Sequence, residues 1–191
     1  MRKFCLFCLF VLLLQSCTTP SYVFKEPSQM GLDFTQGKWL LHNVDNKYIN
    51  QQAVKDFTAF TGNMLGETST AKGLLVTNNV PLQPDKQLLT DLYNGTGYDY
   101  YINIKDEITR DDIAAVEIGS NNIRSEGSAG VTLEIYDLKN KSIIYSQTVV
   151  GSTQKNPNAK GDVNFYKPAA SLVMGSYNRI IKDIRSKSKV K

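Results

Sequence analysis

The sequence has few of the side chains that usually serve as nucleophiles or metal ligands. Its three cysteines, Cys5, Cys8 and Cys17, all lie within the first seventeen residues. The rest of the chain therefore has no thiol for a disulfide, a cysteine nucleophile or a thiolate metal site. His42 is the single histidine. Because zinc sites usually combine several histidine or cysteine ligands, we expect no metal site, and no motif indicates a cofactor.

The sequence also lacks the short motifs of common enzyme classes. No G-x-S-x-G motif of the serine hydrolases occurs, and His42 lies within the apolar run 39–44, so we expect a structural or surface role for it. Gly95-Thr96-Gly97 follows a predicted helix and precedes a predicted strand. A dinucleotide-binding fingerprint needs the reverse order and a third glycine, so this tripeptide is interpreted as a turn.

Neither sign of charge is in large excess. The chain has 22 Lys and Arg against 18 Asp and Glu, a net charge of +4. Removal of residues 1–16 would lower this to +2, because Arg2 and Lys3 would leave. A surface that close to neutral gives no basis for nucleic-acid binding.

Four acidic residues come close together in sequence: Asp106, Glu107, Asp111 and Asp112. Their spacing does not match an EF-hand calcium loop. Since Lys105 and Arg110 lie among them, we expect a solvated loop rather than a cation site.

The first seventeen residues carry the clearest pattern in the chain. Arg2 and Lys3 form a basic start, and residues 4–14 are an unbroken apolar run. As a helix this run would reach about 16 Å, roughly half the hydrocarbon thickness of a bilayer. It is too short to span a membrane, and the combination is typical of a cleavable export signal.

The residues that close this segment, Leu14-Gln15-Ser16-Cys17, resemble the lipobox of bacterial lipoproteins. In that family the cysteine thiol receives a diacylglyceryl group, cleavage occurs just before it, and the new amine is acylated. The resemblance implies that residues 1–16 are a signal peptide and that Cys17 is the lipidated first residue. Thr18 stands where some lipoproteins carry an inner-membrane retention aspartate. The resemblance therefore implies the outer membrane, and we expect the periplasmic side.

Two further regions are predicted after the signal. Residues 17–37 are polar, contain Pro20 and Pro27, and lack sustained periodicity, which predicts a flexible tether whose residues 30–34 could pack on the domain. Residues 38–191 are long enough for a single globular domain with its own core.

Hydrophobic periodicity predicts the elements of this domain. Strands are expected at residues 39–44, 73–77, 98–105, 131–136 and 142–150, with a weaker alternation at 114–118. Helices are expected from about Asn50 to Gly66, from the N-cap Asp85 to Gly95, and from Pro168 along the stripe Val173, Tyr177, Ile180, Ile181 and Ile184.

The predicted order is therefore β-α-β-α-β-β-β-α. It indicates an α+β, two-layer fold with a mixed sheet, helices on one face, and an antiparallel meander over residues 98–150. With Gly97-Tyr98-Asp99-Tyr100 before the third strand and a hairpin over residues 133–145, the order resembles small envelope lipoproteins of the TolB N-terminal-like α/β fold. These include activators of penicillin-binding proteins.

Strand alternation singles out one aromatic side chain as a candidate contact. Tyr98 and Tyr100 share the predicted core face with Ile102, whereas Tyr101 lies on the other face. Because tyrosine offers a large contact area at a low cost in entropy, Tyr101 is the predicted partner contact.

Two functions remain open from the sequence. The favoured one is a non-catalytic, lipid-anchored envelope protein that binds another envelope component, either a protein or a cell-wall-related partner such as peptidoglycan. The alternative is a small envelope hydrolase that uses carboxylates, with Asp99, Asp106 or Glu107 as candidates.

Overall fold

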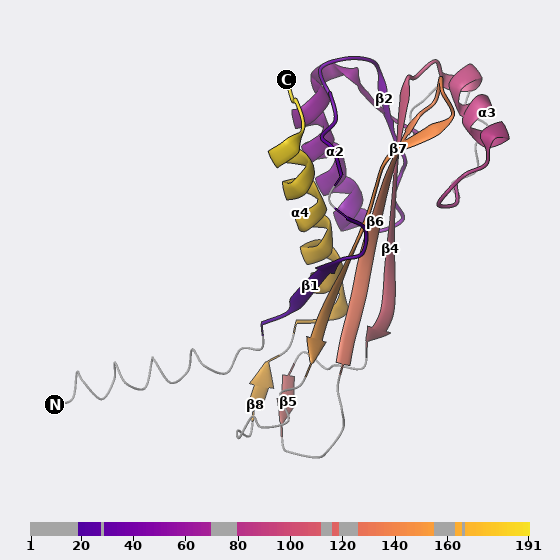
Figure 1. The fold of residues 1–191 in the computed structure, drawn as a ribbon. Coiled ribbons are helices and arrows are strands. Elements are labelled where there is room, and N and C mark those ends of the chain that lie inside the picture. Colours follow the sequence, from indigo (N-terminus) through magenta and orange to yellow (C-terminus); the bar gives the residue numbers. More distant parts are fainter. Residues whose placement is uncertain are drawn as a thin grey trace.

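A six-stranded mixed sheet forms the framework of the molecule in the computed structural model (Figure 1). The structure describes residues 19–27, 29–69, 80–111, 116–118, 126–154, 163–165 and 167–191. The predicted signal peptide, Cys17 and the predicted strand 73–77 lie outside the described residues. Among the described residues, no helix is both long enough and apolar enough to cross a membrane.

The sheet has the strand order β1-β7-β6-β4-β2-β3. Its members are β1 (Ser21–Phe24), β2 (Trp39–Leu41), β3 (Leu65–Glu67), β4 (Tyr100–Asp111), β6 (Glu126–Asp137) and β7 (Ser142–Gln154). Strand β2 pairs in parallel with β3 and β4, and the other neighbours are antiparallel. A separate pair joins β5 (Val116–Ile118) to β8 (Val163–Phe165). The predicted α+β class, mixed sheet and antiparallel pairing of the meander strands are confirmed.

Among the described residues, three α-helices cover the sheet: α2 (Lys47–Thr61), α3 (Lys86–Thr96) and α4 (Ala169–Lys187). A short 3-10 helix, η2 (Gly62–Met64), follows α2. Figure 1 shows α2 and α4 on one side of the strands and α3 on the other, near one end. Helix α3 therefore departs from the predicted single helical layer. The reason lies in β2, whose side chains Trp39, Leu40 and Leu41 are all buried, so both of its faces need cover.

The main core lies between the sheet and helices α2 and α4. The stripe predicted for the last helix is confirmed, since its five members are each at most 5% exposed and all belong to this core: Val173, Tyr177, Ile180, Ile181 and Ile184. A second, smaller core lies under α3 and contains Leu40, Val80, Leu89, Leu92, Tyr101, Tyr136 and Leu138.

Local capping sets the helix boundaries and corrects three predicted ones. Helix α2 begins at Lys47, earlier than expected, because the Asn46 side chain accepts hydrogen bonds from the backbone N–H groups of residues 48 and 49. It ends before Gly62, whose φ is 66°, so residues 65–67 form strand β3 rather than the predicted last turn. Asp85 caps α3 as predicted, but the left-handed C-cap is Gly97, not Gly95.

The N-terminal segment is packed on the domain and differs from the predicted flexible tether. Strand β1 pairs with β7, where Ser21 lies opposite Ser152 and Phe24 opposite Val149. Farther along, the Glu26 carboxylate accepts from the backbone N–H of Thr148. Residues 21–26 and Gln29 are thus held against β7 by backbone and side-chain hydrogen bonds. Leu32 and Phe34 instead hydrogen-bond to residues 188 and 189, which follow α4, and Phe34 is fully buried.

Three strands are longer than predicted. Strand β7 runs on to Gln154, beyond the predicted end at residue 150, and β4 runs on to Asp111, beyond the predicted end at residue 105. Strand β6 spans Glu126–Asp137, where residues 131–136 were predicted. Asp106 and Glu107 therefore lie within a paired strand, opposite Val131 and Gly130, and not in a solvated loop. The fourth acidic residue of that group, Asp112, lies outside the described residues.

The structure predicts opposite effects for two adjacent substitutions on α4. Ile181→Asp places a carboxylate in the main core and should lower the free energy of unfolding by at least about 3 kcal/mol, against a typical total of about 5–15 kcal/mol. Lys182→Asp changes an exposed position and should cost less than about 0.5 kcal/mol. Urea denaturation of both variants measures this difference, and equal losses would contradict the packing of α4.

Candidate functional site

The structure places the predicted contact residue Tyr101 in the interior. Its side chain is 0% exposed and its hydroxyl lies 2.9 Å from Nδ1 of His42, which is itself 2% exposed. The predicted exposed contact is therefore wrong. Strand alternation correctly puts Tyr101 on the face opposite Ile102, but that face is covered here by α3 and the residues before it. His42 and Tyr101 are a buried pair within the fold.

The three carboxylates considered for a hydrolase do not meet. Asp99 accepts a hydrogen bond of 2.8 Å from the backbone N–H of Lys38, and Asp106 accepts one of 2.9 Å from Asn46. Glu107 is exposed and, as the next strand residue, points to the opposite face from Asp106. Asp99 precedes Asp106 by seven residues, about 23 Å along an extended chain. No two of the three are placed for paired carboxylate chemistry, which needs separations of about 5–9.5 Å.

The described residues also contain no group of three or more His, Cys, Asp and Glu side chains that could hold a metal ion. One buried carboxylate, Glu134, was not singled out from the sequence. It is 2% exposed and accepts hydrogen bonds from the Tyr136 hydroxyl and, at 3.0 Å, from the backbone N–H of Gln83. On the facing strand, Asn103 donates to the carbonyl of Pro81 at 2.9 Å.

These buried polar groups have a structural role, because their hydrogen-bond partners lie in a loop that packs on the sheet. They bind residues 81–83, which lead into α3, to the middle of the sheet. Gln83 holds a φ of 51°, unusual for a residue with a side chain, and its N–H also lies 3.1 Å from the Tyr136 hydroxyl. Sequence alternation puts Glu134 on the face away from the main core, but it gives no sign that a loop covers it.

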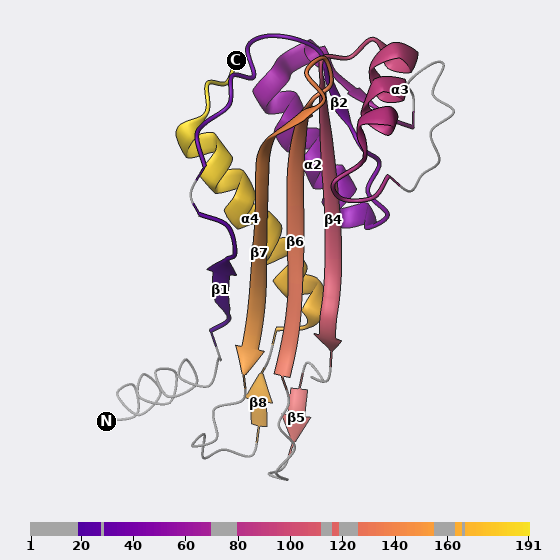
Figure 2. The same cartoon turned by 45° about the vertical axis from the view of Figure 1, so that its right-hand side comes forward.

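Below α3, no helix of the described residues lies over the same side of the sheet. Figure 2 shows the lower lengths of β4, β6 and β7 side by side, with α4 behind them and α3 confined to the upper end. We call this surface the open face and define it by the side chains that point from it. They are Lys105, Glu107, Ser128, Thr132, Thr148, Val150 and Ser152.

The open face is polar and contains little charge. In one row across the strands, Lys105 lies beside Thr132 and Thr132 beside Thr148. The hydroxyls of Thr132 and Thr148 are 3.0 Å apart. The next row contains Gly130 between Glu107 and Val150, so a side chain is missing from the middle of the surface.

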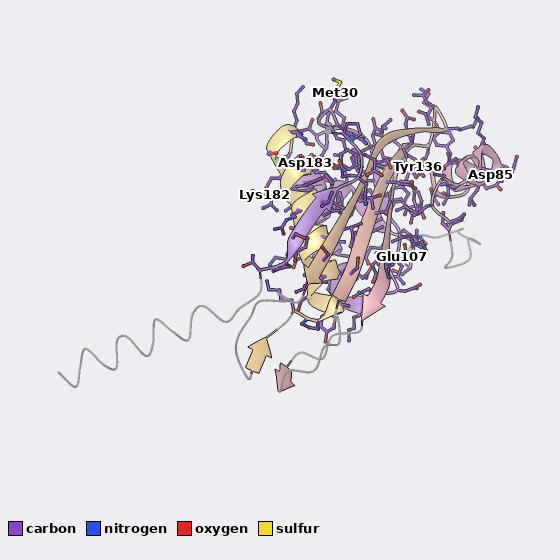
Figure 3. All side chains as sticks on the ribbon, turned by 60° about the horizontal axis from the view of Figure 1, so that its bottom comes forward. Met30, Asp85, Glu107, Tyr136, Lys182 and Asp183 are labelled. Carbon is purple, nitrogen blue, oxygen red and sulfur yellow. The ribbon has the colours of Figure 1, made fainter. Side chains whose placement is uncertain are left out.

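Figure 3 labels Glu107 on β4 and Asp183 on α4, which lie on opposite sides of the strands. The open face therefore offers hydroxyl donors and acceptors, one cation and one carboxylate on the surface of the sheet. Among the described side chains of this face, no serine or threonine hydroxyl is hydrogen-bonded to Lys105 or Glu107. Such an arrangement suits a partner laid against the sheet rather than a substrate held in a cleft.

Comparisons with known proteins add little to this geometry. No family model matches the chain, and no curated protein matches it. Among solved structures, the chain is similar to a PelC dodecamer from Paraburkholderia phytofirmans, with 10% identity, a TM-score of 0.45, and coverage of 90% of this chain and 99% of that chain. A PelC variant dodecamer from the same organism gives 9% identity, a TM-score of 0.42, and coverage of 87% and 98%. At these values neither likeness supports an inference about function.

Because His42 and Tyr101 form a buried pair, we predict that removal of the Tyr101 hydroxyl lowers the stability of the fold. Tyr101→Phe removes the hydroxyl that lies against Nδ1 of His42 and should lower the free energy of unfolding by about 1–3 kcal/mol. The matched control is Tyr48→Phe, at a side chain that is 76% exposed, which should change it by less than about 0.5 kcal/mol. Denaturant unfolding of both variants would contradict the buried pair if Tyr101→Phe were as stable as the control.

Two buried tyrosines predict how stability depends on alkaline pH. Burial raises the pKa of Tyr101, with a contribution from the nearby Tyr136, and burial together with the Asp56 carboxylate raises that of Tyr177. The folded state therefore holds both protons more tightly than the unfolded state does. This stabilisation is complete below about pH 10 and is lost as the pH rises further, by about 1.4 kcal/mol per pH unit for each tyrosine that ionises only on unfolding.

Tyrosine absorbance at alkaline pH measures this directly. At least two of the ten tyrosines should ionise only when the circular dichroism of the fold is lost. Ionisation of all ten near pH 10, with the fold intact, would contradict the burial of Tyr101 and Tyr177.

Proposed function

We propose that this protein is a non-catalytic, lipid-anchored lipoprotein of the bacterial cell envelope. It binds another envelope component, a protein or a cell-wall-related partner, from the periplasmic side of the outer membrane. The observation that carries the proposal is the lipobox-like Leu14-Gln15-Ser16-Cys17, which follows a basic start and a short apolar run.

The open face supports a binding role. An antiparallel sheet can leave one face to solvent, and here that face offers serine and threonine hydroxyls beside a single Lys105 and Glu107. A partner can satisfy these groups with hydrogen bonds while it excludes water from the sheet. The alternative, a hydrolase with paired carboxylates, has less support because Asp99, Asp106 and Glu107 lie apart.

Substitution of the anchor residue tests the first half of the proposal. Cys17→Ala removes the thiol that would carry the diacylglyceryl group, and each buried methylene of such a chain contributes about 0.8 kcal/mol of membrane affinity. We expect the variant to fractionate as a soluble chain or as an uncleaved precursor. Processing to the mature length with unchanged membrane fractionation would contradict the proposal.

Site-specific photo-crosslinking in cells tests the second half. A photoreactive residue at Lys105, on the open face, should form a discrete crosslinked species that mass spectrometry can identify as an envelope component. The matched control replaces Lys86, an exposed lysine on α3, and should not form that species. The same crosslinking pattern from both positions would contradict binding through the open face.

A further inference from the structure

The short connection between Cys17 and the folded domain restricts how the protein can stand on a membrane. Residue Ser21 already pairs with Ser152, and its hydroxyl lies 2.8 Å from the Ser152 hydroxyl. Only four peptide steps separate Cys17 from Ser21, at most about 14 Å of chain. This restriction rests on the proposed lipid anchor. If Cys17 carries it, β1 must lie close to the bilayer surface.

Strand β1 bears apolar side chains that its position in the fold leaves exposed. Val23 is 55% exposed and Phe24 is 43% exposed. Val23 lies opposite Val150 and points from the outer margin of the open face, whereas Phe24 lies opposite Val149 and points from the face that α4 covers. An exposed apolar pair on an edge strand is unfavourable in water and favourable against the acyl region of a lipid surface.

Exposed cations flank this apolar pair. Lys25 follows it in sequence, and Arg179 and Lys182 project from α4, one turn apart on the same side of that helix. The guanidinium of Arg179 lies 3.5 Å from the centroid of the Tyr22 ring, which places this part of α4 beside β1. Lys25 and Lys182 form no side-chain ion pair among the described residues.

The acidic groups on this side of the molecule are held in other contacts. The Glu26 carboxylate accepts hydrogen bonds from the β7 backbone and, at 3.2 Å, from the Gln147 side chain. Asp183 forms an ion pair with Lys187 and lies 3.5 Å from the Tyr145 hydroxyl. The side of the molecule formed by β1 and α4 therefore presents a cationic rim around an apolar pair, and Figure 3 shows Lys182 projecting from it.

We propose that this side, the membrane edge (Val23, Phe24, Lys25, Arg179 and Lys182), docks on an anionic phospholipid surface. The apolar pair enters the headgroup boundary and the three cations contact lipid phosphates. The sheet then stands edge-on to the bilayer. The open face points along the membrane surface and stays accessible to a partner.

Depth measurements on the full-length lipidated protein test the docking. The thiol of Cys17 would be blocked by lipid, so Val23→Cys introduces a single site for a nitroxide label. The protein is reconstituted into vesicles in which about one third of the phospholipid is anionic, enough for cations to gain from the surface potential. We expect the label at position 23 to collide more with lipid-soluble oxygen than with a water-soluble nickel chelate. A label on Lys86→Cys, on α3, should show the reverse.

The same depth measurement on a charge-reversed protein provides a second test of the docking. Lys25→Glu combined with Lys182→Glu, in the Val23→Cys background, should weaken docking by at least about fivefold for each lysine lost. The label should then become accessible to the nickel chelate while the protein still floats with the vesicles. Both lysines are exposed, so the fold should be unchanged.

The possible outcomes distinguish a failure of the docking proposal from a failure of the lipid-anchor proposal. Protein that floats with the vesicles, but whose label at position 23 is as accessible to the chelate as the label at position 86, would overturn the membrane edge and leave the anchor intact. Protein that fails to float would contradict the lipid anchor and the docking together.

Discussion

The attachment of the N-terminal segment to the outer edge of β7 is the interaction on which the arrangement of this protein depends. An edge strand exposes unpaired backbone groups that invite association with other chains. Here β1 pairs with one part of that edge, and the side chains of Glu26 and Gln29 hydrogen-bond to the β7 backbone beyond it. The same contacts leave only a short connection between Cys17 and the domain, so they also determine which side of the molecule would lie near the proposed lipid anchor.

The two faces of the sheet differ in how much of each is covered by helices. One is covered along its length by α2 and α4, which bury the main core. The other is covered only at its upper end, where α3 and the residues before it pack on Tyr101 and where the sheet's Glu134 and Asn103 hold that cover in place. These buried polar groups stabilise the fold, and the remaining part of this face is the part that we propose binds a partner.

The sequence predicted the features that depend on local periodicity and capping. The apolar stripe of α4, the Asp85 cap and the hairpin of β6 and β7 each follow from spacing within one element. The exposure of Tyr101 could not be predicted, because it depends on which face α3 covers. Strand β1 was missed for a related reason: it is short, and much of what holds this segment is a set of hydrogen bonds to residues more than 100 positions away. The separation of Asp99, Asp106 and Glu107 likewise depends on how far β4 extends.

An edge-on protein with an accessible open face requires Cys17 to be the lipidated first residue of the mature chain. Mass spectrometry of the N-terminal peptide, from protein extracted from the cell envelope, measures this directly. The expected result is a peptide that begins at Cys17 and carries the mass of a diacylglyceryl group and an amide-linked acyl chain. A mature chain that begins at another residue, or an unmodified Cys17, would contradict the account.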